Sequence, residues 1–500
     1  MKKSTLLLFA ALLLAVNACR KQESTTSAGQ QAAPDPGALD EFIRAKLETE
    51  EQFLWSWASD EQIWTALSNS DFVLSVGYQP AGFSNIDDKM HLLDLQSPEW
   101  KAAHDAIFRI VLDSERSLNP ALRASDILAF EENAHLPVFD VYVKNPQTIT
   151  ALRNSSLLRY AEPIGYEPYM TTASERSSSG CGSNTPQTGL VAGSDYTVIT
   201  PNCKQSWNYS YHNIAQAWNN GNTGAGTTVM IIDSGCSTSQ DNLGSAFNQG
   251  SSSGRTVTKY VTLPGATSPN DPCGHGTSMM GACTAPRGTD GNAVGVAYNA
   301  NLVAVRGADD VYLDTSNETV GVSNAYTLAG NTASVKIVSM SMGRLLTANQ
   351  IRDAIIYAYN NGKLIFCAAG TSFSWTAWFA GVIFPASMTQ AVAVTGIKTN
   401  LTSRCSACHS GSKVDFVVVM EKNSDGHPLS LADYGNDPST VGGSSVSTAT
   451  TAGIAALVWA KYPSWTRQQV FDRLKTSSNY YPSRNSEFGW GRINAQTATQ

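Results

Sequence analysis

The sequence predicts an α/β fold with a central, mostly parallel sheet flanked by helices, preceded by a small α+β domain. From about residue 205 to the C-terminus, short apolar runs alternate with helix-compatible stretches, and such runs suit strands buried on both faces of a parallel sheet. Residues 39–165 instead carry most of the charge clusters and mix helical periodicity with half-buried strand patterns. A length of 500 residues also favours more than one domain.

The composition excludes two broad classes of protein. Hydrophobic residues make up 42% of the chain and charged residues 15%, so the chain is globular and not disordered. The net charge is −7, which argues against a nucleic-acid binder held by phosphate contacts.

Residues 1–18 are predicted to be a secretory signal peptide. A short basic start is followed by the apolar run 6–16, which is far shorter than the roughly 20 residues that span a bilayer as a helix. The end of the run, Val16-Asn17-Ala18-Cys19, resembles the lipobox of bacterial lipoproteins. This resemblance implies cleavage before Cys19 and a lipid on its thiol. Ordinary cleavage after Ala18, which leaves a free thiol, is the alternative.

Two segments have the composition of flexible chain. Residues 19–38 are rich in Gln, Ser, Thr, Ala, Pro and Gly, which is typical of a tether. Residues 166–204 are predicted to be an exposed linker, because the stretch 171–187 has almost no large apolar residue. Exposed linkers are preferred sites of proteolysis, so we expect a maturation cut within 166–204.

Each domain is predicted from a small set of elements. For residues 39–165 these are helices over 39–56, 100–114 and 146–154 and strands over 138–143 and 157–164. For residues 205–500 they are buried strands over 229–232, 302–305, 337–340 and 364–367, and a long helix over 446–461.

Three polar residues with complementary chemistry stand beside these elements. Asp233 ends a buried strand, and His275 and Ser445 each precede a predicted helix. A serine hydroxyl needs a neighbouring base to become a nucleophile, and a histidine oriented by an aspartate supplies one near neutral pH. The order Asp, His, Ser is one of the known orders of this triad.

The motifs around these residues, over about residues 205–496, resemble those of the subtilases, the subtilisin-like serine peptidases. The matching segments are Ile231-Ile232-Asp233-Ser234-Gly235, Gly274-His275-Gly276-Thr277, Val338-Ser339-Met340-Ser341-Met342-Gly343, Gly443-Ser444-Ser445 and Gly489-Trp490-Gly491-Arg492-Ile493-Asn494. The resemblance implies a three-layer subtilisin-like fold and a serine endopeptidase. It implies that Ser445 attacks, that His275 moves the proton, and that Asp233 orients the imidazole.

The chain departs from the family pattern at the oxyanion hole. The family places an asparagine after Ala-Ala-Gly, whereas this chain has Thr371 after Ala368-Ala369-Gly370. Loss of such a donor costs on the order of 100- to 1,000-fold in kcat, although the backbone N–H of Ser445 would remain. We therefore expect an active but slow or specialised enzyme, with Thr371 as a donor of shorter reach. The alternative is a catalytically impaired, peptide-binding module with the protease fold.

The resemblance also implies where substrate binds. The edge formed by Ser341, Met342 and Gly343 would pair with an extended peptide, and Ala368, Ala369 and Gly370 would form a wall of the main specificity pocket. The alternative is that both segments are core strands. Expected partners are protein or peptide substrates, with no nucleic acid.

The domain at 39–165 resembles the inhibitory propeptides of subtilases, chiefly in its second half. It would then fold first, template the protease and block its cleft until the linker is cut. The sequence thus predicts an autoprocessed zymogen, exported from a bacterial cell as an outer-membrane or cell-surface lipoprotein through Cys19, with release of the protease after maturation.

Without Cys19, eight of the nine cysteines remain, and an exported chain is expected to form disulfides. Cys181 and Cys203 flank the linker and could pair, and a bridge involving Cys236 or Cys273 could brace the triad. Cys405 and Cys408 are expected to form a local disulfide, whereas Cys283 and Cys367 suit buried thiols. No cofactor is required; for the structural calcium common in this family, Asp309, Asp310 and Asp314 are the candidates.

Overall fold

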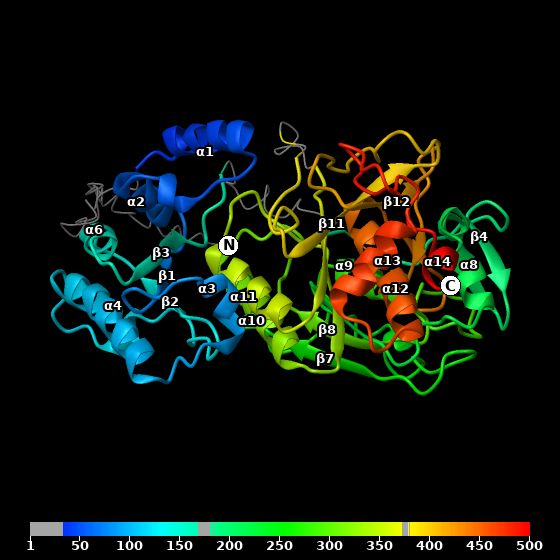
Figure 1. Cartoon of the computed structure of the whole chain (residues 1–500), viewed down its shortest axis with the longest axis horizontal. Coiled ribbons are helices and arrows are strands. Elements are labelled where there is room, and N and C mark those ends of the chain that lie inside the picture. The colour runs from blue at the N-terminus through cyan, green and yellow to red at the C-terminus, as the bar shows by residue number, and fades with distance from the viewer. Residues whose placement is uncertain (1–33, 169–180, 183, 373–378, 380) are drawn as a thin grey trace, which may run out of the picture.

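A computed structural model describes residues 34–168, 181–182, 184–372, 379 and 381–500. Two units lie side by side along the long axis of the molecule: a smaller N-terminal unit, blue to cyan, and a larger unit, green to red (Figure 1). The predicted signal peptide and Cys19 lie outside the described residues. Among the described residues, no helix combines the length and apolar character needed to cross a membrane.

The N-terminal unit is a three-stranded antiparallel sheet with helices packed on it. The strand order is β2-β1-β3, with β1 (Val73–Tyr78) in the centre, flanked by β2 (Val138–Tyr142) and β3 (Leu158–Pro163). Its helices are α1 (Gly37–Glu50), α2 (Asp60–Ser68), α3 (Ile86–Lys89), α4 (Pro98–Arg116), α5 (Ala124–Ile127) and α6 (Gln147–Arg153), with 3-10 turns η1 (Trp55–Trp57) and η2 (Met90–Leu92).

This unit differs from the sequence prediction at the end of α1, and helices α2, α3 and α5 and strand β1 were not predicted. The helix expected over 39–56 ends at Glu50, because Glu51 adopts a left-handed backbone conformation with φ of 54°. Strand β1 was not predicted, since Ser75 and Gly77 interrupt its apolar residues and the fully buried segment lacks the alternation of a half-buried strand. It is buried on both faces because the sheet also packs on the larger unit.

The larger unit is built on a seven-stranded sheet in which every neighbouring pair is parallel. The strand order is β12-β11-β10-β9-β6-β8-β7. The strands are β6 (Thr228–Asp233), β7 (Val257–Val261), β8 (Asn301–Arg306), β9 (Val335–Met340), β10 (Leu364–Ala368), β11 (Ala391–Lys398) and β12 (Phe416–Glu421). A small pair, β13 (Leu429–Ser430) and β14 (Ser439–Thr440), lies outside this sheet.

Helices cover both faces of the parallel sheet, so the predicted three-layer α/β fold is confirmed. On one face, α9 (His275–Thr284) and α12 (Gly443–Lys461) pack with Val229 and Ile231 of β6. On the other face, α10 (Ser316–Asn331) and α11 (Asn349–Asn360) pack with Met230 and Ile232. The remaining helices are α8 (Ile214–Asn219), α13 (Arg467–Thr476) and α14 (Ala495–Ala498), with 3-10 turns η3 (Trp207–His212) and η4 (Asp241–Leu243).

The segment predicted as a linker is partly folded. The hairpin of β4 (Tyr196–Ile199) and β5 (Cys203–Ser206) lies within or beside it, and the buried Asn184 donates hydrogen bonds to the carbonyls of Gly274 and Leu431. The chain from Asn184 onward therefore belongs to the larger unit. The predicted linker of 166–204 is too long.

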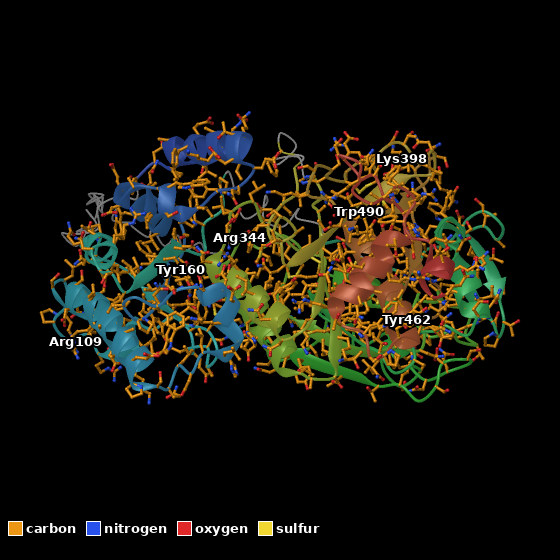
Figure 2. The ribbon with its side chains drawn as sticks, viewed as in Figure 1. Arg109, Tyr160, Arg344, Lys398, Tyr462 and Trp490 are labelled. Carbon is orange, nitrogen blue, oxygen red and sulfur yellow. A yellow bond between two sulfur atoms is a disulfide. The ribbon has the colours of Figure 1, made fainter. Side chains whose placement is uncertain are left out.

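The N-terminal unit packs on α11 and caps its N-terminus. Arg159 forms a two-pronged ion pair with the fully buried Asp353, at 2.7 and 2.9 Å. A carboxylate oxygen of Glu162 accepts the backbone N–H of Asn349, the first residue of α11, at 2.7 Å. Figure 2 shows Tyr160 and Arg344 at this junction between the two units.

Candidate active site

Asp233 occupies the carboxyl end of strand β6 and is completely buried. Its Oδ1 lies 2.7 Å from Nδ1 of His275 and also accepts the backbone N–H of Ser234 at 2.9 Å. An aspartate in this position holds the imidazole in the tautomer that leaves Nε2 free to act as a base.

His275 is the first residue of helix α9. Burial lowers its pKa, but the charge of Asp233 and the hydrogen bond to it outweigh that effect, so the pKa of His275 is raised above 6.5. The helix start fits closely on the end of β6: a Cβ on Gly276 would lie 2.2 Å from the carbonyl oxygen of Gly235. Glycine at 276 is therefore required for this approach.

Asp271 organises the turn that leads into His275, a role that sequence reasoning missed. One carboxylate oxygen accepts the Ser234 hydroxyl at 2.9 Å and the Gly274 N–H at 2.8 Å. The other accepts the N–H and the hydroxyl of Thr277 at 2.8 and 2.7 Å. Asp271 thus ties the strand carrying Asp233 to the helix carrying His275. The signal in the sequence was the turn-forming Asp271-Pro272 pair ahead of the helix.

Ser445 lies in the first turn of α12, which begins at Gly443 and not at the predicted Val446. The Ser445 hydroxyl donates to the carbonyl of Ser341 at 3.3 Å, and the Ser341 hydroxyl donates to the carbonyl of Ser445 at 3.0 Å. Strands β6 and β9 are neighbours, with Ile232 paired to Met340. Asp233 and Ser341 therefore both lie at the carboxyl ends of these parallel strands. The contact with Ser341 places Ser445 beside the Asp233–His275 pair.

Thr371 lies against the same helix start, but its hydroxyl is engaged. The hydroxyl of Ser444 donates its one proton to the carbonyl of Gly370 at 2.9 Å. It can then only accept from Thr371 Oγ1, at 3.2 Å. In this geometry the Thr371 proton points to Ser444 and not into the site. The N–H of Ser445, in the first turn of a helix, remains as a donor for an oxyanion.

A small cavity of about 30 Å³ adjoins Ser445. Five of the predicted substrate residues line it: Ser341, Met342, Gly343, Ala368 and Gly370. Val311, Tyr312 and Ile383 also line it and were not predicted. Ala369 is not among the lining residues, because it is fully buried in the core beneath.

The edge at Gly343 is already paired within the protein. Its N–H donates to the carbonyl of Val311 at 3.2 Å, and its carbonyl accepts from the N–H of Leu313 at 3.0 Å. The backbone groups of Gly343 are therefore not free to bind a peptide by strand addition, contrary to the sequence prediction. The sequence did not reveal this pairing, because the segment 311–313 is too short to be predicted as a strand.

The family model described as the subtilase family matches residues 224–491, more than half of the chain and all three residues of the site. The chain belongs to the subtilase family. It is accordingly a serine endopeptidase, as the motifs predicted.

Similar proteins agree with this assignment. The subtilase is 29% identical over 311 residues to an alkaline protease of Alkalihalobacillus alcalophilus, which covers 61% of this chain and 73% of that protein. It is 29% identical to subtilisin Savinase of Lederbergia lenta, over 59% of this chain and 98% of that protein. The crystal structure of MycP1 from the ESX-1 type VII secretion system matches with a TM-score of 0.50 and 20% identity, covering 64% of this chain and 93% of that one, and shows the shared fold.

In this subtilase a disulfide-bonded loop supports the segment 368–371. Cys405 and Cys408 form the predicted local disulfide. The next residue, His409, is buried directly behind Gly370. Its N–H donates to the carbonyl of Gly370, and its ring lies 2.8 Å from the carbonyl of Gly381 and 3.0 Å from the hydroxyl of Ser372. His409 thus fixes the backbone next to Thr371.

The other disulfide confirms the expected bridge at Cys273, whereas the predicted pairing of Cys181 with Cys203 is wrong. Cys181 bonds to Cys273, two residues before His275, whereas Cys203 and Cys236 are buried free thiols. Spacing alone could not select this partner, since the two cysteines lie 92 residues apart. Cys283 and Cys367 are buried thiols, as predicted.

The three aspartates predicted as calcium ligands do not form a cluster of carboxylates. The described residues contain no group of three or more His, Cys, Asp or Glu side chains placed to hold a metal. Asp309 pairs with Arg306, and the N–H groups of Asp309, Asp310 and Asp314 all point to the carboxylate of Glu318. These residues do not fit a calcium ion.

Proposed function

We propose that this subtilase cleaves peptide bonds through a triad of Asp233, His275 and Ser445. His275 Nε2 takes the proton of the Ser445 hydroxyl as Ser445 Oγ bonds to the substrate carbonyl carbon. The imidazolium then gives that proton to the leaving amine, and an acyl-enzyme remains. Water repeats the sequence to release the acid and regenerate Ser445. The buried Asp233 carboxylate stabilises the imidazolium in each half.

The 2.7 Å contact between His275 Nδ1 and Asp233 carries the proposal. Ser445 donates to Ser341 in the structure, so its hydroxyl must rotate toward His275 for the reaction. Catalytic hydrogen bonds often form only in the complex with substrate.

Covalent labelling tests the assignment of the nucleophile. A fluorophosphonate should modify the wild-type protein at Ser445, as located by peptide mass spectrometry, and should not modify Ser445→Ala. Ser444→Ala is the matched control, because this neighbouring hydroxyl faces Gly370, and it should still be labelled at 445. Labelling of Ser445→Ala at another residue would overturn the assignment.

We further propose that the N-terminal unit is an inhibitory propeptide. Its last described turn reaches the substrate cavity: Glu167 accepts from the Tyr312 hydroxyl at 2.7 Å, and Tyr312 lines that cavity. Glu167 also pairs with the buried Arg344 at 2.6 Å. These contacts favour a domain that covers the cleft until it is removed.

Processing can be tested with the Ser445→Ala variant in a host that lacks other proteases. The variant should accumulate at full length, whereas the wild type should yield a shorter protein with a new N-terminus between residues 169 and 183. Normal processing of Ser445→Ala would exclude autoprocessing while leaving the peptidase assignment untouched.

Export as a lipoprotein is proposed from the signal-like N-terminus, and two disulfides support an oxidising compartment. Mass spectrometry of the exported precursor should find a lipid on Cys19, and Cys19→Ser should abolish it. An unmodified thiol at Cys19 would favour ordinary secretion instead.

A further inference from the structure

A second, larger cavity lies at the opposite end of the central strands from the active site. It has a volume of about 500 Å³, within the range typical of small-molecule sites. It lies at the amino ends of β9 and β10, beside Lys336 and Lys363, whereas Ser341 and Ala368 mark the carboxyl ends near Ser445. The two sites are thus separated by the length of these strands.

The cavity is lined by cations without counter-charges. Its twelve lining residues include Lys336, Lys363 and Arg467 and no carboxylate. Among the described residues, none of the three forms an ion pair at 4.0 Å or less. The ends of helices α10, α11 and α12 each contribute only about half a negative charge, so the three full positive charges dominate.

Lys363 is the most constrained of these cations. The residue is only 3% exposed, and its ammonium donates to the carbonyls of Thr332 and Val335 at 2.7 and 2.8 Å. An ammonium has three N–H donors, so one remains. Burial and the neighbouring charge of Lys336 lower the pKa of Lys363 to about 8. An anion placed between the two lysines would remove this repulsion.

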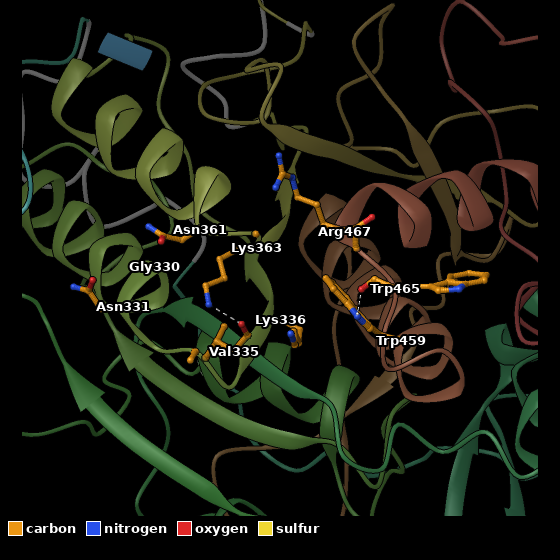
Figure 3. Close-up of a pocket in the computed structure, with 12 residues that line it drawn as sticks. Gly330, Asn331, Val335, Lys336, Asn361, Lys363, Trp459, Trp465 and Arg467 are labelled. Atoms are coloured by element: carbon orange, nitrogen blue, oxygen red, sulfur yellow. Dashed lines mark hydrogen bonds between the residues drawn. The ribbon is translucent and has the colours of Figure 1, made fainter. Parts of the chain in front are cut away.

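A flat apolar wall faces the lysines. Figure 3 shows Lys336 and Lys363 on the strand side of the cavity and Trp459 on the side of α12. The Lys336 ammonium lies 5.9 Å from the centre of a Trp459 ring, and the indole N–H of Trp459 donates to the carbonyl of Trp465 at 3.0 Å. That hydrogen bond fixes the ring. Arg467 also lines the cavity, and its guanidinium stacks on Tyr359, 3.6 Å from the ring centre.

We propose that this cavity binds an organic anion whose carboxylate or phosphate group lies between Lys336 and Lys363 and whose body packs on Trp459. Unpaired ammonium groups select the anion, and the volume is too large for an inorganic ion alone. The proposal is independent of the peptidase mechanism.

Calorimetric titration of the full-length Ser445→Ala protein tests the proposal, because this variant cannot digest itself. Citrate and glucose 6-phosphate are the carboxylate and phosphate probes, and glucose is the neutral control. At least one anion should bind with a Kd below about 10 mM, and more weakly as salt increases, whereas glucose should not bind. Absence of binding by both anions would overturn the proposal.

Variants locate the site. Lys336→Met removes an exposed lysine and should fold normally, and it should weaken binding at least about tenfold, the scale of one charge-assisted hydrogen bond. Lys461→Met, at an exposed position outside the lining, is the matched control and should leave Kd unchanged. Unchanged binding in Lys336→Met would place the anion elsewhere and overturn the assignment.

Chemical modification gives a second readout that does not depend on a variant. The bound anion should reduce the reaction of Lys363 with an amine-selective reagent at pH 8, as measured by peptide mass spectrometry, while Lys461 stays equally reactive. Protection of neither cavity lysine would contradict the proposal.

Discussion

In the proposed mechanism, His275 determines the acidic limit of activity of this subtilase. It acts as a base only when neutral, and its pKa is raised above 6.5 by Asp233 despite its burial. Because a raised pKa keeps the imidazole protonated to a higher pH, activity should be lost as pH falls through a value above 6.5.

The pH profile of kcat/KM on a peptide substrate measures this limit. The expected rising limb has an apparent pKa above 6.5 in the wild type. Asp233→Asn should move that limb to lower pH and reduce kcat by roughly 10⁴-fold, because the amide leaves the wrong tautomer. A wild-type limb below 6.5 would contradict the assigned contact.

Substitutions of Thr371 would show which groups stabilise the oxyanion. Since its hydroxyl points to Ser444 in the structure, Thr371→Val should change kcat less than about threefold. Thr371→Asn should instead increase kcat by at least about tenfold, because it restores a long side-chain donor. Steady-state kinetics on one peptide compare the three proteins. A large loss in Thr371→Val would show that the hydroxyl already serves the oxyanion.

At the scale of elements, the two disulfides should differ in what they stabilise. The Cys181–Cys273 bridge joins residues 92 apart, and the Cys405–Cys408 bridge joins residues 3 apart. In the chain-entropy account, removal should cost about 4–5 kcal/mol for the first bridge and about 1–2 kcal/mol for the second.

Urea unfolding in the Ser445→Ala background compares the two double variants, Cys181→Ala/Cys273→Ala and Cys405→Ala/Cys408→Ala. The short bridge should matter more for activity, because its loop holds His409 behind Gly370. Activity of the second double variant, measured with Ser445 restored, should fall by more than its loss in stability explains. An equal effect of both pairs on stability would contradict the entropy argument.

Elements with a strong local pattern could be predicted from sequence, and those defined by tertiary contact could not. Strands β6 and β8 and helix α12 follow apolar runs, and their ends were within a few residues of the prediction. Strand β1 was missed because Ser75 and Gly77 interrupt its apolar residues, so that it shows neither an apolar run nor an alternating pattern. The partner of Cys181 and the pairing of Gly343 with segment 311–313 were also missed, since each depends on residues distant in sequence.

The same distinction holds for the site. Asp233, His275 and Ser445 could be proposed from sequence because each lies in a motif whose chemistry is explicit. Asp271 and His409 act through hydrogen bonds to backbone and neighbouring side chains, which no spacing reveals.

At the scale of the whole molecule, the junction between the two units should respond to pH. Burial raises the pKa of Glu162, at the N-terminus of α11, to about 7. Because this pKa is raised in the associated state, protonated Glu162 favours association, and the effect is complete at a pH below 4.5, the ordinary pKa of a glutamate. This contribution is lost as the pH rises through about 7.

The cleaved but undissociated protein should therefore separate faster at pH 8.5 than at pH 6. Size-exclusion chromatography after an added protease has cut the linker before Cys181 measures the separation, in the Ser445→Ala background. Glu162→Gln keeps the shape and should abolish most of the difference between the two pH values. The same pH dependence in Glu162→Gln would exclude this carboxyl as the cause.

The bridge between Cys181 and Cys273 determines what happens to the pieces after a cut. After a break before Cys181, only noncovalent contacts join the protease to the N-terminal unit, which carries any lipid on Cys19. The enzyme can then diffuse away from the membrane. A break between 182 and 202 leaves a sulfur–sulfur bond across it, so the enzyme stays anchored until a thiol reductant arrives. Electrophoresis with and without reductant would distinguish a shed protease from a retained one.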